Sequence, residues 1–274
     1  MTYIRPFLKW AGGKHRVLDH IIPELNTHPH GLLIEPFMGS GVVWLNAPQK
    51  KIVANDINAD LVSLYQALAE KGEAYIQTAM KQFSIKNNTK EQYAKLKNKF
   101  NILPFGPERA ALFIYLNRHG FNGMCRYNSR GEFNIPYGKY TSPSFPEMSM
   151  RQWLETYHTK KIVFKQQNFI DIMNTAKVGD VIYADPPYVP LTNTANFTQY
   201  AKEGFDSAAQ QQLADLANNL SQKGVKIIIS NHDNAITRAL YEKSNRIKSF
   251  SVRRSISAKA SSRGQASELL AIWD

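Results

Sequence analysis

The tetrapeptide Asp185-Pro186-Pro187-Tyr188 directly follows the apolar run Val181 to Ala184, which is typical of a buried strand. Because proline cannot continue a strand ladder, the chain must leave the sheet here with its carbonyl groups unpaired. The Asp185 carboxylate and the Pro186 carbonyl are therefore predicted at the carboxyl end of the sheet, where α/β proteins bind ligands, with the flat ring of Tyr188 beside them. The alternative interpretation is a rigid loop with an aromatic plug.

These groups suit a planar base that carries an exocyclic amine. The lone pair of such an amine is delocalised into the ring, which makes the nitrogen a poor nucleophile. Two acceptors, the Asp185 carboxylate and the Pro186 carbonyl, would hold the two amine hydrogens and favour a tetrahedral nitrogen whose lone pair faces a methyl donor. Positioning and electrostatics then suffice without a covalent intermediate. The single cysteine, Cys125, stands in no context for the nucleophile that C5 methylation of cytosine needs.

A glycine-rich turn and a later acidic residue indicate a second half of the site. Phe37-Met-Gly39-Ser-Gly41 follows the apolar run Gly31 to Glu35, and glycines there allow the backbone to approach a ligand closely. Asp56 ends the next strand-like run, Lys51 to Asn55, at the position where such folds bind ribose hydroxyls. The pair also fits a dinucleotide oxidoreductase, and Asp56 has the alternative role of capping the helix that follows.

The elements that must position these residues alternate between strand and helix. After residues 31–35 and 51–55, strands are predicted at 161–164, 180–184, 225–230, 247–252 and 268–273, with helices at 59–70 and 208–222. This alternation predicts an α/β fold with a mostly parallel sheet that is covered on both faces. Residues 73–119 are predicted to be helical throughout, and 125–140 to form a β-hairpin around Ser129-Arg130-Gly131. We therefore expect a catalytic domain of residues 1–56 and 161–274, with an inserted lobe at 57–160.

Charge and composition constrain the partners and the location. The 274 residues carry a formal charge of +12, which favours a polyanionic partner, although solvated basic faces also occur without one. The segment 246–263 holds six basic and no acidic residues and is a candidate phosphate contact. The N-terminus has no apolar stretch typical of a signal peptide, and no run approaches the length of about 20 residues that a membrane span needs. We expect a cytoplasmic protein without a metal site and without an obligate protein partner.

Several segments stand in the order typical of one enzyme family. They are Phe7-Leu-Lys-Trp-Ala-Gly-Gly-Lys14, Glu35-Pro-Phe-Met-Gly-Ser-Gly41, Asp56, Leu116-Asn-Arg-His-Gly-Phe-Asn122, Gly131-Glu-Phe-Asn-Ile-Pro136, Asp185-Pro-Pro-Tyr188, Ala195-Asn-Phe197 and Ser230-Asn-His-Asp233. Over essentially its full length the chain resembles the DNA adenine methyltransferases of the Dam type, in the α-group of amino-methyltransferases. The resemblance implies a Rossmann-like class I methyltransferase sheet with an inserted, mainly helical DNA-recognition lobe that carries the hairpin.

The resemblance also implies the reaction and the residues of the cofactor pocket. The enzyme would transfer a methyl group from S-adenosylmethionine to N6 of adenine in double-stranded GATC, in a bacterial or phage nucleoid. Asp185, Pro186 and Tyr188 would be catalytic, and Phe169 would lie beside the adenine ring of the cofactor. The cofactor-binding residues would be Trp10, Lys14, Glu35, Phe37, Gly39, Gly41, Asp56, Phe169 and Asp185.

DNA recognition is implied for the inserted lobe. The segment 122–139 would reach the major groove, where Arg126 would make a forked contact with guanine O6 and N7. The target base must flip out of the duplex, and residues 193–200 would order around it. Lys139 stands where the family usually carries arginine. Lysine keeps the positive charge but cannot make the bidentate contact of a guanidinium. The DNA-binding residues would be Lys9, Phe121, Asn122, Met124, Arg126, Pro136, Lys139, Arg253 and Arg254.

Other functions remain open at this stage. The same chemistry would serve cytosine N4, an adenine in RNA or a protein glutamine. Glutamine-modifying enzymes usually show Asn at the position of Asp185, and the RNA enzymes lack the hairpin. A catalytically silent DNA-binding regulator would show a damaged Asp-Pro-Pro-Tyr or glycine-rich element, and both are intact here.

Overall fold

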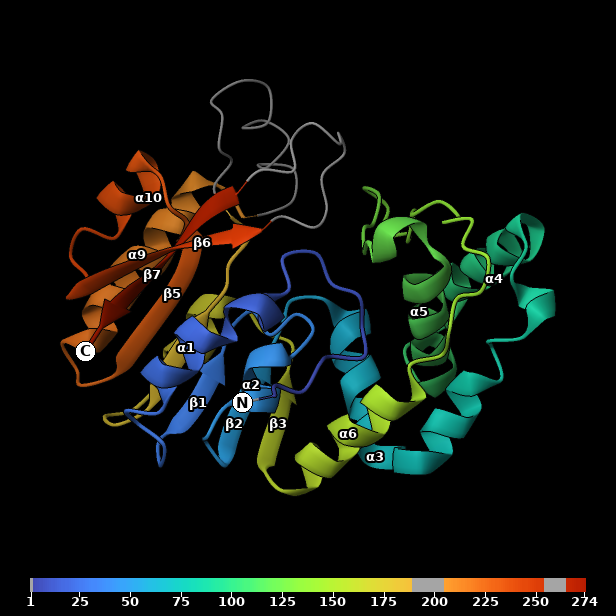
Figure 1. Cartoon of the computed structure of the whole chain (residues 1–274), viewed down its shortest axis with the longest axis horizontal. Coiled ribbons are helices and arrows are strands. Elements are labelled where there is room, and N and C mark those ends of the chain that lie inside the picture. The colour runs from blue at the N-terminus through green and yellow to red at the C-terminus, as the bar shows by residue number, and fades with distance from the viewer. Residues whose placement is uncertain (1, 189–204, 254–264) are drawn as a thin grey trace.

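A single mixed sheet organises the computed structural model, which describes residues 2–188, 205–253 and 265–274 (Figure 1). Its seven strands lie in the order β3-β2-β1-β4-β5-β7-β6. Strands β1 to β5 are parallel, and β7 runs antiparallel to both β5 and β6. The strands are β1 (Leu32–Glu35), β2 (Lys51–Asn55), β3 (Lys161–Lys165), β4 (Val181–Ala184), β5 (Lys226–His232), β6 (Arg246–Arg253) and β7 (Gln265–Trp273). The α/β class predicted from the alternation of strands and helices is confirmed.

The order of the parallel strands reverses between β1 and β4. Leu33 of β1 pairs with Val181 of β4 on one side and with Ile52 of β2 on the other. Because these strands are parallel, the loops that follow them all emerge at one edge of the sheet. This is the topological switch point, where doubly wound folds bind ligands.

Both faces of the sheet are buried, because successive side chains of each strand point to opposite sides. In β4, Val181 and Tyr183 belong to one apolar cluster, whereas Ile182 and Ala184 belong to the other. The first cluster includes α1 (Leu18–Leu25), α2 (Val42–Asn46) and α3 (Ala59–Met80), and the second includes α7 (Phe169–Met173) and α9 (Ser207–Ser221). The short α10 (Ala235–Leu240) packs on α9. The sheet is therefore rigid beneath the loops that carry the candidate site.

Between β2 and β3 the chain is mainly helical. The prediction that residues 73–119 are helical throughout is wrong, because the segment is divided into separate helices. Helix α3 is followed by the 3-10 turn η2 (Ile85–Asn87), α4 (Lys90–Ile102), α5 (Pro107–His119) and α6 (Glu147–His158). New helices begin because Thr89 caps α4 with its side chain and Pro107 occupies the first turn of α5. Helices α4 and α5 extend away from the sheet at the right of Figure 1.

Two of these helices also cover the sheet. The rings of Tyr65 in α3 and Trp153 in α6 stack on each other at a centroid distance of 5.6 Å, and both stack on Phe164 of β3. The apolar cluster that begins at the sheet continues without a break into α4 and α5. The helices at 59–158 therefore share one hydrophobic core with the sheet.

A charged cluster fixes the C-terminal strands to α1. Lys226 Nζ lies 2.7 Å from Asp274 Oδ1, and Arg246 donates to Glu24 Oε2 at 3.0 Å. Lys248 also donates to Glu24. The Lys226 and Glu24 side chains are only 2% and 5% exposed, and each of these buried charges has a partner of opposite charge that offsets the cost of its burial. Within the described ranges, no helix combines the length and the apolar character needed to cross a membrane.

Candidate active site

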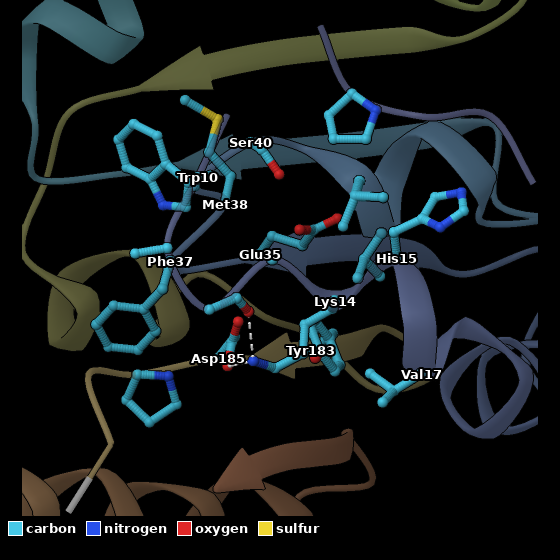
Figure 2. Close-up of a pocket in the computed structure, with 18 of the residues that line it drawn as sticks. Trp10, Lys14, His15, Val17, Glu35, Phe37, Met38, Ser40, Tyr183 and Asp185 are labelled. Carbon is cyan, nitrogen blue, oxygen red and sulfur yellow. Dashed lines mark hydrogen bonds and ion pairs between the residues drawn. The ribbon is translucent and has the colours of Figure 1, made fainter. Parts of the chain in front are cut away.

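A cavity of about 950 Å³ opens at the carboxyl ends of β1, β2 and β4 (Figure 2). Its wall also includes the N-terminal segment around the short 3-10 helix η1 (Lys14–Val17). The structure thus brings together most of the predicted cofactor and catalytic residues, which are separated by up to 178 positions in the sequence: Trp10, Lys14, Glu35, Phe37, Gly39, Asp56, Asp185, Pro186 and Tyr188.

The glycine-rich turn after β1 has the left-handed backbone that only glycine adopts easily. Gly39 has φ +47° and Gly41 has φ +70°, and Gly41 directly precedes α2. A Cβ atom on Gly39 would lie 2.8 Å from the indole nitrogen of Trp10. Trp10 therefore packs directly on the turn and lines the cavity, whereas Gly41 shapes the turn without reaching the cavity wall.

Asp56 lies at the end of β2 and is held by backbone amides. Its Oδ2 accepts a hydrogen bond from the Gly39 N–H, and its Oδ1 accepts one from the Asn58 N–H, both at 3.0 Å. Asn58, and not Asp56, caps α3 by accepting from the Leu61 N–H. Burial raises the pKa of Asp56, and the backbone donors oppose that shift. The carboxylate is thus fixed in the cavity wall rather than used as a helix cap.

Glu35 ends β1 as a buried carboxyl at the cavity wall (Figure 2). The residue is only 1% exposed, and burial raises its pKa well above the usual value. Its Oε1 atom has no hydrogen-bond partner among the described residues. Because a buried polar atom is costly when it is unpaired, this oxygen is available to a donor group of a ligand.

Asp185 follows β4 and is paired with a buried lysine. Lys14 Nζ lies 3.1 Å from Asp185 Oδ1 and donates to the Gly12 carbonyl at 2.7 Å. The Ser230 hydroxyl donates to the same Asp185 oxygen at 2.9 Å. Burial raises the pKa of Asp185, and the Lys14 charge and the Ser230 hydrogen bond oppose this effect. Lys14 and Ser230 therefore favour the carboxylate form that can accept hydrogen bonds from an amine.

Tyr188 is fixed from three sides. Its hydroxyl donates to Glu268 Oε2 at 3.0 Å, and Lys14 Nζ lies 4.4 Å from the centre of its ring. The imidazole of His232 packs edge-on against the ring at 4.6 Å. His232 of β5 and Glu268 of β7 are paired in the sheet, so the sheet itself positions this aromatic face.

Glu268 and His232 also line the cavity, and the sequence had not assigned a role to either. Glu268 begins the apolar run 268–273, and a charged residue at the start of a buried strand is the signal that was available. His232 belongs to the Ser230-Asn-His-Asp233 segment, which was noted only for its resemblance.

Phe169 does not line this cavity. It is 7% exposed and packs behind Phe37, with the two ring centres 5.5 Å apart. Phe205 contacts both rings at 5.4 Å. Phe37 therefore lines the cavity, and Phe169 supports it from behind in this structure.

The segment predicted as a hairpin folds back on itself with little regular pairing. It contains one isolated antiparallel bridge, Tyr127 with Phe133, and a second bridge joins Tyr137 to Gly120, which precedes the segment; no strand is assigned within it. The Asn128 side chain accepts from the N–H groups of Arg130 and Glu132, and such local hydrogen bonds compete with a regular ladder. A continuous β-hairpin is thus not formed, although the turn lies where the sequence placed it.

The predicted DNA-contacting side chains of this segment lie on its surface. Arg126 is exposed, and its Nε donates to Asn134 Oδ1 at 2.9 Å, which orients the guanidinium. Asn122 and Lys139 have φ values of +54° and +55°, so both occupy sharp bends. The exposed members of the set are Phe121, Asn122, Met124, Arg126, Pro136 and Lys139, whereas Lys9 is half-buried.

A buried polar cluster attaches this segment to the helices. Arg109 makes two hydrogen bonds with Asp60, at 2.5 and 3.0 Å, and the Tyr127 hydroxyl donates to Asp60 at 2.7 Å. Asn58 Nδ2 lies 3.5 Å from Cys125 Sγ. Burial raises the pKa of the Cys125 thiol to about 11, so this cysteine is not a thiolate nucleophile at neutral pH.

Three of the predicted DNA-contacting elements lie wholly or partly outside the part of the chain that the structure describes. Residues 193–200 and Arg254 lie outside the described residues. The backbone of Arg253 ends β6, but its side chain is likewise outside the description. Among the residues that are described, no group of three or more His, Cys, Asp or Glu side chains is arranged to hold a metal ion.

The strand order and the cavity at the switch point define a doubly wound α/β protein and are consistent with a Rossmann-like methyltransferase. Residues 10–256 match the family described as D12 class N6 adenine-specific DNA methyltransferase, and the chain belongs to this family. It is 42% identical to proteins named DNA adenine methylase from Salmonella typhi and Escherichia coli K12, over 98% of this chain and 95% of each relative. A protein of the same name from Vibrio cholerae is 39% identical over 98% of this chain and 96% of its own length.

The family decides between functions that the residues had left open. The chain is an adenine-specific DNA methyltransferase, so the cytosine-N4, RNA, protein-glutamine and oxidoreductase alternatives fall away. The intact Asp185-Pro186-Pro187-Tyr188 element at the cavity also argues against a catalytically silent regulator.

Proposed function

We propose that this enzyme transfers the methyl group of S-adenosylmethionine to N6 of a flipped adenine in double-stranded GATC. The observation that carries the proposal is the position of Asp185. Its carboxylate lies at the end of β4, within the same cavity as Asp56 at the end of β2. One cavity therefore offers an acceptor for a base amine and an acceptor for ribose hydroxyls, at the ends of the two strands that flank β1.

The residues present fit S-adenosylmethionine. The cavity of about 950 Å³ is within the usual range for a small-molecule site. Asp56 would bind the ribose hydroxyls, and the unpaired Oε1 of Glu35 would accept from a cationic amine. Trp10 and Phe37 provide apolar surface, with Phe169 behind Phe37 as support. When bound, the cofactor supplies an activated methyl group on its sulfonium.

The residues of the loop after β4 would prepare the target amine. Asp185 and the Pro186 carbonyl would accept its two hydrogens and favour a tetrahedral nitrogen with its lone pair directed at the methyl group. Burial raises the pKa of Asp185 and the Lys14 charge opposes that shift, so Lys14 favours the carboxylate form that acts as an acceptor. Tyr188 would stack on the flipped base, and Glu268 holds the ring by its hydroxyl.

We propose that residues 57–160 recognise the DNA. Arg126 would read a guanine through its two terminal nitrogens, because its Nε already donates to Asn134 Oδ1 and leaves the terminal nitrogens for the base. Lys9 would approach from the N-terminal segment, and the high positive charge would favour the phosphate backbone. Phe121, Asn122, Met124 and Pro136 would pack on bases or fill the space of the extruded one. Lys139 would contribute its positive charge, and Arg253 and Arg254 would contact phosphates.

Methylation mapping tests the proposal directly. The protein is expressed in a strain that lacks adenine methylation, and modified bases are mapped across the genome. We expect 6-methyladenine at GATC in cells that express the wild-type protein and none with an Asp185→Ala variant. Methylation at sites without GATC would refute the sequence specificity, and modified cytosine would refute the proposed target atom.

A further inference from the structure

The side chain of Asn117, in the last turns of α5, makes three hydrogen bonds to backbone atoms of two other segments. Its Oδ1 accepts from the Lys9 N–H at 3.0 Å, and its Nδ2 donates to the Lys9 carbonyl at 2.7 Å and to the Gly123 carbonyl at 3.0 Å. Asn117 is 1% exposed, so these bonds are shielded from water. A single amide group thus binds the N-terminal segment and the loop that follows α5.

The two segments that Asn117 joins are in direct contact. A Cβ atom on Gly123 would lie 2.4 Å from Cβ of Lys9, and Gly123 has φ +63°. No other residue fits this position without displacing one of the segments. The loop containing Phe121, Asn122 and Met124 therefore packs against Lys9 without a gap.

The Lys9 side chain continues this contact toward the surface. Its ammonium lies 4.3 Å from the centre of the Tyr140 ring, and the Tyr140 hydroxyl accepts from the Asn122 N–H at 3.0 Å. Lys9 is also the neighbour of Trp10, which lines the cofactor cavity. The backbone that Asn117 holds thus connects the cavity wall with the exposed loop.

We propose that Asn117 is a positioning residue for base recognition. It fixes Lys9 and the 121–124 loop in one register, so that base contacts from the two segments fall on the same duplex. The proposal rests on the proposed DNA-reading role of Lys9 and this loop. Base contacts require donors placed to within a few tenths of an ångström, and an unheld loop would still bind DNA but would discriminate bases poorly.

A matched control exists in the same chain. Asn46 binds the N-terminal segment in the same manner, since Oδ1 accepts from the Ile4 N–H at 2.7 Å and Nδ2 donates to the Ile4 carbonyl at 3.0 Å and to the Val42 carbonyl at 2.8 Å. It therefore makes the same number and type of bonds as Asn117. None of these bonds reaches the 121–124 loop.

The experiment compares Asn117→Ala with Asn46→Ala. The value of kcat/KM is measured on a GATC duplex and on duplexes changed at each single base pair. We expect Asn117→Ala to lower the preference for GATC by about tenfold at one position or more, within the range for loss of a base contact. Asn46→Ala should change kcat/KM by the same factor on every duplex. If Asn117→Ala also acts equally on every duplex, Asn117 is only a structural residue and the proposal is wrong.

Two further variants make the result decisive. If Asn117→Ala does not fold, Gly123→Ala separates the loop from Lys9 while Asn117 is retained, and it should lower the same preference. A double variant with Lys9→Ala should discriminate no worse than Lys9→Ala alone at the base that Lys9 reads. Additive losses at that base would refute a role that acts through Lys9.

These outcomes are distinguishable from failure of the proposed function. If the wild-type enzyme prefers a site other than GATC, the proposed specificity fails. The loss of preference in Asn117→Ala is then measured against the mapped site.

Discussion

Substitutions at Tyr188 separate the flat face of its ring from its hydroxyl. Tyr188→Ala removes both, whereas Tyr188→Phe removes only the hydroxyl that donates to Glu268 Oε2 at 3.0 Å. In Tyr188→Phe the ring still has two contacts, the Lys14 ammonium at 4.4 Å and the His232 ring at 4.6 Å. The phenylalanine ring should therefore stay near its position but with more freedom.

The magnitudes follow from these contacts. Stacking of a base on an aromatic ring contributes about 1–3 kcal/mol, so Tyr188→Ala should slow methyl transfer by roughly 5- to 150-fold. A hydrogen bond to a charged acceptor is worth about 1.5–3 kcal/mol when fully buried. Tyr188 is only half-buried and keeps its other contacts, so we expect a loss of about 3- to 10-fold for Tyr188→Phe.

The assay is single-turnover methylation of a GATC duplex at saturating cofactor. Flipping is measured separately by the fluorescence of a second duplex that carries 2-aminopurine at the target position, which lacks the N6 amine and is not methylated. Glu268 supplies the matched pair of variants. Glu268→Gln keeps an acceptor for the tyrosine hydroxyl and should stay close to the wild-type rate. Glu268→Ala removes the acceptor and should match Tyr188→Phe.

Two results would refute this reasoning. If Tyr188→Phe is as slow as Tyr188→Ala, the hydroxyl takes part in the chemistry and the stacking account is wrong. If both Tyr188→Phe and Glu268→Ala keep the wild-type rate, the hydrogen bond does not orient the ring.

Three further predictions concern other parts of the molecule. Asp185→Ala removes one of two acceptors for the amine and should lower the single-turnover rate by about 10²–10³ or more, with a rate near wild type as the contrary result. Arg126→Ala should reduce discrimination at one base pair by about 1–3 kcal/mol, and Asn134→Ala by less; an unchanged ratio of cognate to altered duplexes would exclude Arg126 as a base reader. Burial alone would raise the pKa of Glu24, but hydrogen bonds from Lys248 and Arg246 hold that pKa below its usual value. The Glu24 carboxylate therefore stabilises the fold fully above about pH 4.5, and this stabilisation is lost as the pH falls through the lowered pKa. Glu24→Gln should therefore cost about 1–3 kcal/mol in urea unfolding at pH 7 and little near pH 2, and an equal cost at both pH values would contradict the assigned ionisation.

The strands and the residues that follow them could be predicted from the sequence. The run 51–55 coincides with β2, and the run 180–184 differs from β4 by one residue. Such agreement is expected, because strands buried on both faces are short apolar runs and proline ends them by local geometry. The placement of Asp56 and Asp185 at one edge of the sheet follows from the same parallel arrangement.

Local pattern was insufficient at two places in the structure. The segment 125–140 is polar and interrupted by glycine like a hairpin, yet the Asn128 side chain forms local hydrogen bonds and only one isolated bridge lies within the segment. Phe169 packs behind Phe37 rather than on the cavity wall, because three aromatic rings meet there, one of them from Phe205.

The sequence by itself determined the class of fold, the position of the Asp185-Pro186-Pro187-Tyr188 element directly after a buried strand and the excess of positive charge, since each depends on neighbouring residues or on composition. The tertiary structure alone decided which side chains act together. Glu268 meets Tyr188 across 80 positions of sequence, and Asn117 meets Lys9 across 108. These contacts depend on strand order and on the packing of α5 against the N-terminal segment, and neither leaves a periodic signal in the residues themselves.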